Sequence, residues 1–351
     1  MNYYYFKIYL LFCITAIHKQ MKKILITIFF LIFLVLVVFN YRIPFLKQKG
    51  GPWSIGFANS NSIPEDIFVQ KNIKYPLEQL KSINDSTHFL ADPFFLKVKD
   101  TFYLFFEHKK IEPNAEIGLL TSTDGRNYMY RGTVLKEKFH LSYPQVFKYK
   151  KNYYMIPESQ GSNHVLLYKA SRFPFGWKVC DTLLKNIKLK DPTIYISDTL
   201  NILLATDNKL TMYMYQSDSL FGKWKLHKKP KVIMGSESRC GGRIFVDKNR
   251  LIVPIQNATN GYGFGVSLYN LRFKNDDYTI KRVKPFFLKG HKNIKEFNAG
   301  MHHFDIQKIN KGYYYVYDGN RLGNKKNLWN IKGSLKMNYY DFKNWLYQSL
   351  N

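Results

Sequence analysis

Polar residues stand at both ends of a stretch that otherwise has the pattern of a β-hairpin. Residues 88–107 run HFLADPFFLKVKDTFYLFFE, with Asp92 at the start of the first apolar run and Glu107 at the end of the second. Because these two ends lie side by side in a hairpin, we expect the carboxyl groups to meet at one edge. Crowded carboxyl groups shift one another's pKa and can divide into acid and base, as glycosidic cleavage requires.

The same arrangement recurs four more times along the chain. The predicted pairs are Asp92 with Glu107, Tyr143 with Glu158, Asp191 with Thr206, Gly242 with Gln256, and His303 with Asp318. The repeat length is about 50 residues and each unit consists of strands, which predicts a β-propeller of five four-stranded blades. Because innermost strands line the channel of a propeller, these ten positions should form a polar ring at one mouth.

Three carboxyl groups of this ring are the main catalytic candidates. Asp92 and Asp191 each precede a proline at a strand entrance, where the chain is expected to be stiff and extended. In an enzyme, Asp92 would be the base or nucleophile, Asp191 would orient the site and tune pKa values, and Glu158 would be the acid. The structural alternative is that an Asp before a strand caps a turn.

A second motif, SESRCGGRIF, begins at Ser236. Arg239 and Arg243 flank a glycine pair, so backbone can approach a ligand while the guanidinium groups hold a phosphate or carboxylate. Glu237 is a second candidate for the acid, or the partner of one arginine in a salt bridge.

Further residues in the ring or next to it are candidates for substrate contact. We assign this role to Glu107, Tyr143, Arg239, Arg243, Gln256, His302, His303 and Asp318. Adjacent side chains of a strand point to opposite faces, so the pair His302 and His303 does not predict a metal site. The sequence predicts neither a metal nor a cofactor.

An apolar segment near the N-terminus predicts a membrane anchor. Met21, Lys22 and Lys23 lead into ILITIFFLIFLVLVVF, which with its flanks comes close to spanning a bilayer, and no small-residue cleavage site follows. We expect an uncleaved anchor at 21–43, with the large C-terminal part outside the cytoplasm. Residues 1–20 would be an upstream extension or a first hydrophobic segment.

The rest of the chain predicts an all-β domain. Aromatic residues make up 17% of the sequence, which favours strands, and no long apolar 3.6-residue period follows residue 40. We expect residues 44–85 to be a linker that leads into the domain and residues 86–345 to form the five-bladed propeller.

The net charge and the number of cysteines limit which partners and metal sites are expected. The net charge of +28 suits acidic partners such as anionic lipid headgroups or acidic glycans. The lysines are spread along the chain as a solubilising surface and there is no recognisable nucleic-acid module, so nucleic acid is not a predicted partner. Three cysteines are too few and too scattered for a disulfide framework or a zinc cluster.

Several motifs together carry a family resemblance. HFLADPFF with YLFFE, FHLSYPQVF with YYMIPES, VLLYKASRFPFGW, YQSDSLFGKW, SRCGGRIF and LIVPIQNATNGYGFGV follow one another over roughly residues 86–320. In this region the chain resembles the N-terminal domain of plant glucosamine inositolphosphorylceramide transferases and its bacterial relatives. That domain is similar to the five-bladed propellers of glycoside hydrolases such as arabinanases and β-xylosidases.

The resemblance implies that the protein handles a carbohydrate or glycolipid. Hydrolase propellers have Asp at the entrances of blades one and three, here Asp92 and Asp191, and their general acid is a Glu at the entrance of blade four. This chain has SRCGGR there, so Glu237 or Glu158 would have to replace that acid. The plant enzymes carry a separate C-terminal glycosyltransferase domain, and because this chain ends soon after the last blade, transferase activity is not inferred.

Three functions therefore remain open. The first is an enzyme, such as a glycoside hydrolase, acting on a glycan or glycolipid at the mouth. The second is a module that binds such a ligand, with Arg239 and Arg243 holding an anion. The third is a scaffold for protein partners.

Overall fold

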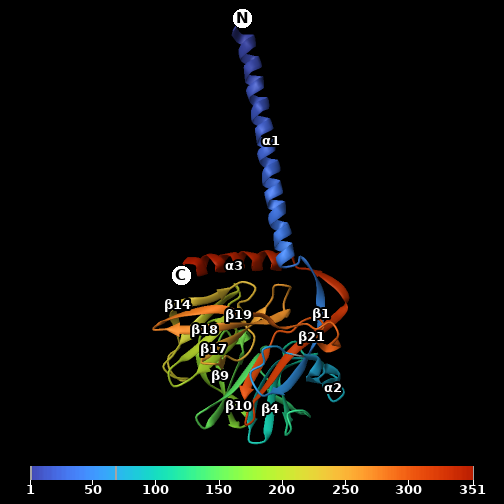
Figure 1. Cartoon of the computed structure of the whole chain (residues 1–351), viewed down its shortest axis with the longest axis vertical. Coiled ribbons are helices and arrows are strands. Elements are labelled where there is room, and N and C mark those ends of the chain that lie inside the picture. The colour runs from blue at the N-terminus through green and yellow to red at the C-terminus, as the bar shows by residue number, and fades with distance from the viewer. Residues whose placement is uncertain (1, 68, 351) are drawn as a thin grey trace.

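The computed structural model describes residues 2–67 and 69–350, and five antiparallel sheets make up most of it (Figure 1). The first blade contains β3 (Thr87–Val98), β4 (Thr101–Lys110), β5 (Glu116–Ser122) and β6 (Met129–Leu135). The second contains β7 (Ser142–Tyr149), β8 (Asn152–Glu158), β9 (Val165–Arg172) and β10 (Phe175–Leu184). The third contains β11 (Lys190–Ile196), β12 (Asn201–Thr206), β13 (Thr211–Gln216) and β14 (Lys225–Met234).

The last two blades depart from this simple order. In blade four, two short strands, β15 (Arg239–Cys240) and β16 (Phe245–Asp247), both pair with β17 (Arg250–Asn257), followed by β18 (Gly265–Lys274) and β19 (Asp277–Lys289). Blade five has the order β20 (Phe304–Lys308), β21 (Tyr313–Trp329), β1 (Leu46–Ser60) and β2 (Ile73–Tyr75). The predicted five-bladed propeller is confirmed.

The stretch 44–85, which we expected to be a linker, is instead part of the ring. Its strand β1 pairs with β21 along most of its length, so an early segment completes the last blade. The physical reason is that a propeller needs its last blade closed to remove a sheet edge. This stretch also holds a 3-10 turn (Val69–Lys71) and the short helix α2 (Leu77–Lys81).

The expected boundary at residue 345 is also different in the structure. The last strand ends at Trp329, and the helix α3 (Ile331–Leu350) follows it. Short 3-10 turns are found at Gln160–Ser162 and Lys295–Phe297.

The core is divided among the spaces between neighbouring blades. Alternating side chains of each sheet point to its two faces, and the apolar ones meet those of the next blade. Phe57 of β1, for example, packs in one cluster with Leu104 of β4, and Phe304 of β20 packs in another with Ile252 of β17. The first strands β3, β7, β11 and β15 contact one another in this order around the channel, and β20 contacts β3. The Phe304 amide of β20 donates to the Gly241 carbonyl, directly after β15, at 2.7 Å. The polar strand ends are therefore brought together at one mouth.

The N-terminal residues form the single helix α1 (Asn2–Arg42), which projects away from the propeller (Figure 1). Its segment Tyr4–Arg42 is long and apolar enough to cross a membrane, and none of its most apolar window is buried against the protein. The same helix runs through residues 2–20 and into the expected anchor at 21–43.

Candidate functional site

The strand entrances that carry the candidate residues have an unusual backbone. Asp92, Tyr143 and Asp191 have φ values of 50°, 50° and 47°, and each lies at an irregularity of the ladder in its blade. Our expectation of an extended conformation before proline was wrong at Asp92 and Asp191. A bulge re-aims a side chain, and backbone strain of this kind is characteristic of functional sites.

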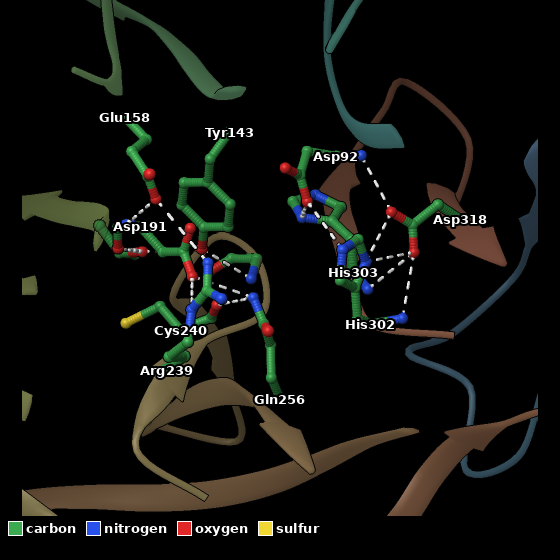
Figure 2. A network of polar contacts seen from close by, with 12 residues as sticks. Asp92, Tyr143, Glu158, Asp191, Arg239, Cys240, Gln256, His302, His303 and Asp318 are labelled. Atoms are coloured by element: carbon green, nitrogen blue, oxygen red, sulfur yellow. Dashed lines mark hydrogen bonds and ion pairs between the residues drawn. The ribbon is translucent and has the colours of Figure 1, made fainter. Parts of the chain in front are cut away.

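The bulges also shift the predicted pairing by one residue. The residue opposite Glu107 is Ala91, the one opposite Glu158 is Ser142, and the one opposite Thr206 is Lys190. In these three blades the candidate side chains therefore do not lie in ladder pairs, whereas Arg239 and Gln256 are ladder partners in blade four. The candidate side chains gather in two clusters, each with residues from different blades (Figure 2).

The first cluster, here called the Asp191 cluster, consists of Glu158, Asp191, Arg239 and Gln256. Arg239 Nε donates to Asp191 Oδ2 at 2.6 Å, and Gln256 Nε2 donates to the same oxygen at 3.0 Å. Glu158 Oε2 accepts from the Asp191 amide at 3.2 Å and lies 3.7 Å from Arg239 Nη2. Three blades thus contribute to one nearly buried network.

The two carboxyl groups of this cluster have opposite pKa shifts. Burial, followed by the neighbouring charge of Asp191, raises the pKa of Glu158 to about 8. Burial acts on Asp191 in the same direction, but the Arg239 guanidinium outweighs it and holds the pKa of Asp191 below its usual value. At neutral pH this cluster therefore pairs a protonated Glu158 with an ionised Asp191.

Tyr143 lies beneath this network and is fully buried. Its hydroxyl accepts from the Gly242 amide at 2.7 Å, lies 3.0 Å from the Gly242 carbonyl, and is 2.8 Å from Thr193 Oγ1. Gly242, at φ 145°, has no room for a Cβ, which would lie 1.8 Å from the Phe304 carbonyl oxygen. Tyr143 thus connects blades two, three and four, and it is not exposed for direct contact with a ligand.

The second cluster, here called the Asp92 cluster, consists of Asp92, His302, His303 and Asp318. Asp318 is its centre, because its carboxylate accepts from the amides of Asp92, His302 and His303 at 2.9, 3.1 and 3.0 Å. His302 Nδ1 lies 2.8 Å from Asp318 Oδ2. The start of blade one is thereby joined to blade five.

The carboxyl groups of the Asp92 cluster also have opposite pKa shifts. Burial raises the pKa of Asp318, but His302 outweighs it and the pKa is lowered overall. Burial and the charges of Glu107 and Asp318 raise the pKa of Asp92 well above its usual range. Burial lowers the pKa of His303 to about 4. Within the described part of the chain, Asp92 Oδ1 and both His303 ring nitrogens are buried without a hydrogen-bond partner.

Two aromatic residues that the sequence analysis did not single out lie beside both clusters. The Trp53 ring stacks on His302 with centroids 3.9 Å apart, and the Tyr262 hydroxyl is 2.9 Å from His302 Nε2. Tyr262 also lies under the Arg239 guanidinium, at 5.5 Å, and is 52% exposed. Nothing in the sequence indicated Trp53, which lies in the stretch expected to be a linker. Tyr262 lies in the motif LIVPIQNATNGYGFGV, which could have indicated it.

Trp53 and Tyr262 form one wall of a cavity of about 400 Å³. The cavity is also lined by Lys47 on β1, the strand that follows α1, and by Leu328 near the end of β21, the strand that leads into α3. At another edge of the mouth, Glu107 Oε1 lies 3.1 Å from His140 Nε2. Burial lowers the pKa of His140, but the hydrogen bond and charge of Glu107 outweigh it and raise the pKa overall.

Three of the mouth residues also offer ligand atoms to a cation. Atoms of Asp92, His302 and Asp318 lie within 4.8 Å of one another. However, Asp318 already bonds to three backbone amides, and both ring nitrogens of His302 have partners in Asp318 and Tyr262. These residues therefore hold one another by hydrogen bonds.

Arg243, a predicted substrate contact, instead holds the channel together. Its Nε donates to Asp305 Oδ1 at 2.8 Å, and its Nη2 donates to the Val146 carbonyl at 2.9 Å. The guanidinium therefore joins first strands of different blades, and its hydrogen bonds are directed to the protein.

Glu237, the alternative acid, points away from the mouth. Its carboxylate accepts from Asn257 at 2.7 Å and from the Tyr269 hydroxyl at 2.8 Å, and it pairs with Arg282 at 2.7 Å. Because Tyr269 and Arg282 belong to β18 and β19, the side chain is turned toward the outer strands of blade four. The structure thus separates Glu237 from the two clusters, and Glu158 is the acid candidate that they contain.

The architecture is that of the five-bladed glycoside-hydrolase propellers. A thermostable family-43 glycoside hydrolase superposes with a TM-score of 0.51 at 13% identity, over 68% of this chain and 91% of the other. The xylan β-1,4-xylosidase of Bacillus halodurans C-125 gives the same TM-score at 14% identity, over 67% of this chain and 50% of the other. At these identities the likeness concerns the fold alone.

The family follows from the sequence matches. Residues 73–320 match the family model described as glucosamine inositolphosphorylceramide transferase 1, N-terminal. The glucosamine inositolphosphorylceramide transferase 1 of Oryza sativa subsp. japonica is 30% identical over 323 residues, and that of Arabidopsis thaliana is 33% identical over 306 residues. The chain belongs to this N-terminal domain family, which confirms the resemblance.

The match leaves a large part of those relatives uncovered. It includes 82% of this chain but 43% of the rice protein, and 79% of this chain but 40% of the Arabidopsis protein. The chain thus spans less than half the length of the curated relatives that it matches.

Proposed function

We propose that the chain is a membrane-anchored propeller that binds the sugar headgroup of a glycan or glycolipid at the mouth of its channel. The observation that carries this proposal is the half-exposed Tyr262 ring, set between the two carboxyl clusters and at the wall of a cavity. Aromatic faces bury the apolar face of a sugar ring, while convergent carboxyl groups fix its hydroxyls. The two matched relatives are named for a sugar and an inositolphosphorylceramide, which agrees with this ligand class.

The charges indicate how such a headgroup would lie. Asp191 already balances the charge of Arg239, and Glu158 is protonated, so the Asp191 cluster suits neutral sugar hydroxyls. Lys47 lines the same cavity, with its side chain close to Gly261, and suits a phosphate. We therefore place the sugar at Tyr262 and an anionic group toward Lys47.

Binding of soluble probes to the full chain in detergent micelles tests this assignment. The probes are glucosamine, inositol and inositol phosphate, and their binding is measured by calorimetry. Tyr262→Ala should weaken the binding of a sugar roughly fivefold, which corresponds to about 1 kcal/mol for the loss of one stacked ring. Tyr262→Phe, which keeps the ring, should weaken it less.

Two further variants complete the test. Phe221 is half exposed and packs near Tyr149 at the opposite ends of the blades, so Phe221→Ala should leave binding unchanged. Lys47→Gln should weaken only the phosphorylated probe, and less so at high salt. Equal binding by wild type and Tyr262→Ala would contradict the proposal and would favour the protein scaffold instead.

A hydrolase is the second candidate, and it is favoured by the pKa division in the Asp191 cluster. Protonated Glu158 can act as a general acid beside an Asp191 that Arg239 holds ionised. Burial and the charges of Glu107 and Asp318 raise the pKa of the expected base, Asp92, and so disfavour its ionised form, which is why binding is the first proposal. The test is to incubate the protein with a panel of glycans and to measure released product. Product that is lost in both Asp92→Asn and Glu158→Gln would make hydrolysis the first proposal and binding alone the second.

We also propose that α1 crosses the membrane once and leaves the propeller outside the cytoplasm. Support comes from the exposed apolar surface of α1. Cys180 on β10 is exposed and Cys240 is buried, so a membrane-impermeant maleimide applied to intact cells should label Cys180. Cys180→Ser is the matched control. Labelling that requires broken cells would place the propeller in the cytoplasm.

A further inference from the structure

The C-terminal helix α3 is amphipathic with its polar face toward the protein. The polar residues that contact the protein recur at helical spacing, and they are Ser334, Asn338, Asp341, Asn344 and Gln348. The other face carries large apolar side chains that are each at least 37% exposed, and they are Leu335, Tyr339, Phe342, Leu346 and Leu350. Trp345 lies at the edge of the polar face by its position in the helix, but its ring is 62% exposed and stacks on Phe342. A helix that covers a protein core instead turns its apolar face toward the protein and its polar face toward water.

The polar contacts fix the rotation of α3 about its axis. Asp341 Oδ1 accepts from the Ser236 amide at 2.7 Å, and Asn344 Oδ1 accepts from the Met234 amide at 2.9 Å. These contacts hold the helix on the end of β14 and on the turn that follows it. The apolar face cannot turn inward unless these hydrogen bonds break.

A second set of contacts fixes α3 to the end of α1. Arg42 donates from Nη1 to Asn338 Oδ1 at 3.1 Å and from Nη2 to Asp341 Oδ2 at 3.0 Å. Ser334 Oγ donates to the Ile43 carbonyl at 2.6 Å. Figure 1 shows α3 running crosswise at the end of α1, on the side of the propeller from which α1 projects.

We propose that α3 is an interfacial helix that lies flat on the bilayer entered by α1, with its apolar face among the lipid headgroups and upper acyl chains. The apolar run of α1 ends at Phe39, and Asn338 Nδ2 donates to the Phe39 carbonyl at 3.3 Å, so α3 lies at the level where that run ends. Trp and Tyr side chains favour this depth, and interfacial helices bury their apolar face by about 5–10 Å. The proposal rests on the membrane anchoring proposed above.

Charge at the edges of α3 agrees with a lipid surface. Lys332 and Lys343 are exposed beside the apolar face, where anionic headgroups would meet them. With α3 on the bilayer and α1 across it, two connected elements would hold the propeller at a fixed height. The cavity end at Leu328 lies one residue before Trp329, which is 76% exposed next to α3, so the candidate site would open close to the lipid surface.

Trp345 provides a probe of this surface, because its ring stacks on Phe342 with centroids 5.8 Å apart. Trp53, Trp177 and Trp224 are buried, whereas Trp345 is 62% exposed, so the difference in fluorescence between wild type and Trp345→Phe reports this position. The full chain is reconstituted into phosphatidylcholine and phosphatidylglycerol vesicles. Quenching is then measured with lipids brominated near the headgroup or deep in the acyl chain, and with aqueous iodide. Trp329→Phe is the matched control for the other exposed tryptophan.

We expect strong quenching of the Trp345 signal by shallow bromines, weaker quenching by deep bromines, and little by iodide. Quenching by iodide alone would overturn the proposal in favour of a water-exposed face. Protection from all quenchers would overturn it in favour of a second protein copy on α3. An alkaline carbonate wash separates the two proposals. Release of the chain from the vesicles would overturn the anchoring by α1 and this inference together, whereas retention with iodide quenching would overturn this inference alone.

Discussion

The left-handed backbone at Asp92, Tyr143 and Asp191 brings buried side chains from separate blades into one mouth. Each residue then acquires its properties from neighbours on other blades. Asp191 is ionised because Arg239 lies beside it, whereas Glu158 is protonated because it is buried next to Asp191. Side chains of the same chemical type therefore have different protonation states within a few ångströms.

The pKa of Glu158 predicts how its replacement changes the pH dependence of stability. Since the pKa is about 8 in the folded protein and 4.5 in the unfolded chain, the folded state binds the extra proton between these values. The stability that this proton supplies is present below the unfolded value and is lost as pH rises through the folded value.

Glu158→Gln should therefore remove part of the fall in stability between pH 5 and pH 8, a part of the order of a few kcal/mol. Melting temperatures of the wild type and the variant in detergent, compared across this range, measure the effect. Parallel pH profiles would show that Glu158 has an ordinary pKa in the folded state.

Replacement of Tyr143 should lower the stability of the folded protein rather than weaken ligand binding. Tyr143→Phe removes the oxygen that accepts from the buried Gly242 amide, and an unpaired buried amide costs about 1–3 kcal/mol. Tyr339 is 56% exposed, so Tyr339→Phe should be close to neutral. The check is denaturant unfolding of both variants. Equal stability would show that the Gly242 amide finds another acceptor.

At the scale of elements, the first strands of the blades are joined by polar contacts around the channel. Arg243 bonds to Asp305 of β20 and to the Val146 carbonyl of β7. Asp318 joins blade five to the start of blade one. These contacts use side chains that the sequence analysis assigned to ligand binding, so part of the polar ring serves the fold.

Arg243→Ala should consequently destabilise the protein strongly. It leaves the fully buried Asp305 carboxylate without its partner, and breaking a buried pair costs about 3–5 kcal/mol. Arg250 pairs with Asp247 in a largely exposed setting, so Arg250→Ala should cost less than about 1 kcal/mol. The two variants are compared by unfolding free energy. A mild effect of Arg243→Ala, together with lost ligand binding, would return Arg243 to the binding site.

At the scale of the whole molecule, an early strand closes the ring. β1 lies next to β21, although more than 200 residues separate partners such as Phe57 and Val316 in the sequence. With β1 and β2 added to β20 and β21, blade five has four strands, and β21 is no longer an exposed sheet edge. It also brings Trp53 against His302, so the same strand contributes to the candidate site.

The closure by β1 predicts that Phe57 behaves as a core residue. Its ring is buried between Tyr128 and Tyr314, so Phe57→Ala should cost about 3–5 kcal/mol. Ile83 is 64% exposed, and Ile83→Ala should be nearly neutral. Thermal unfolding distinguishes the two. A small effect of Phe57→Ala would mean that this segment is a linker, as its composition suggested.

The sequence by itself determined the five repeated strand units, the all-β domain and the apolar helix at the N-terminus. These features depend on local patterns, since strand alternation and an apolar run can be identified within a few tens of residues. The candidate residues at strand entrances were identifiable for the same reason, because their spacing repeats. The one-residue offset at the entrances of blades one to three was not, because proline suggests an extended chain and the bulge depends on neighbouring strands.

Only the tertiary structure decided which of these residues act together. Asp92 and Asp318 are 226 positions apart, and Arg239 and Asp191 are 48 apart, so no local pattern reveals their contacts. The same holds for Arg243 and Glu237, whose partners on other strands draw them away from a ligand. Protonation states and the direction of an amphipathic face depend on what surrounds a side chain, and the folded chain alone supplies those surroundings.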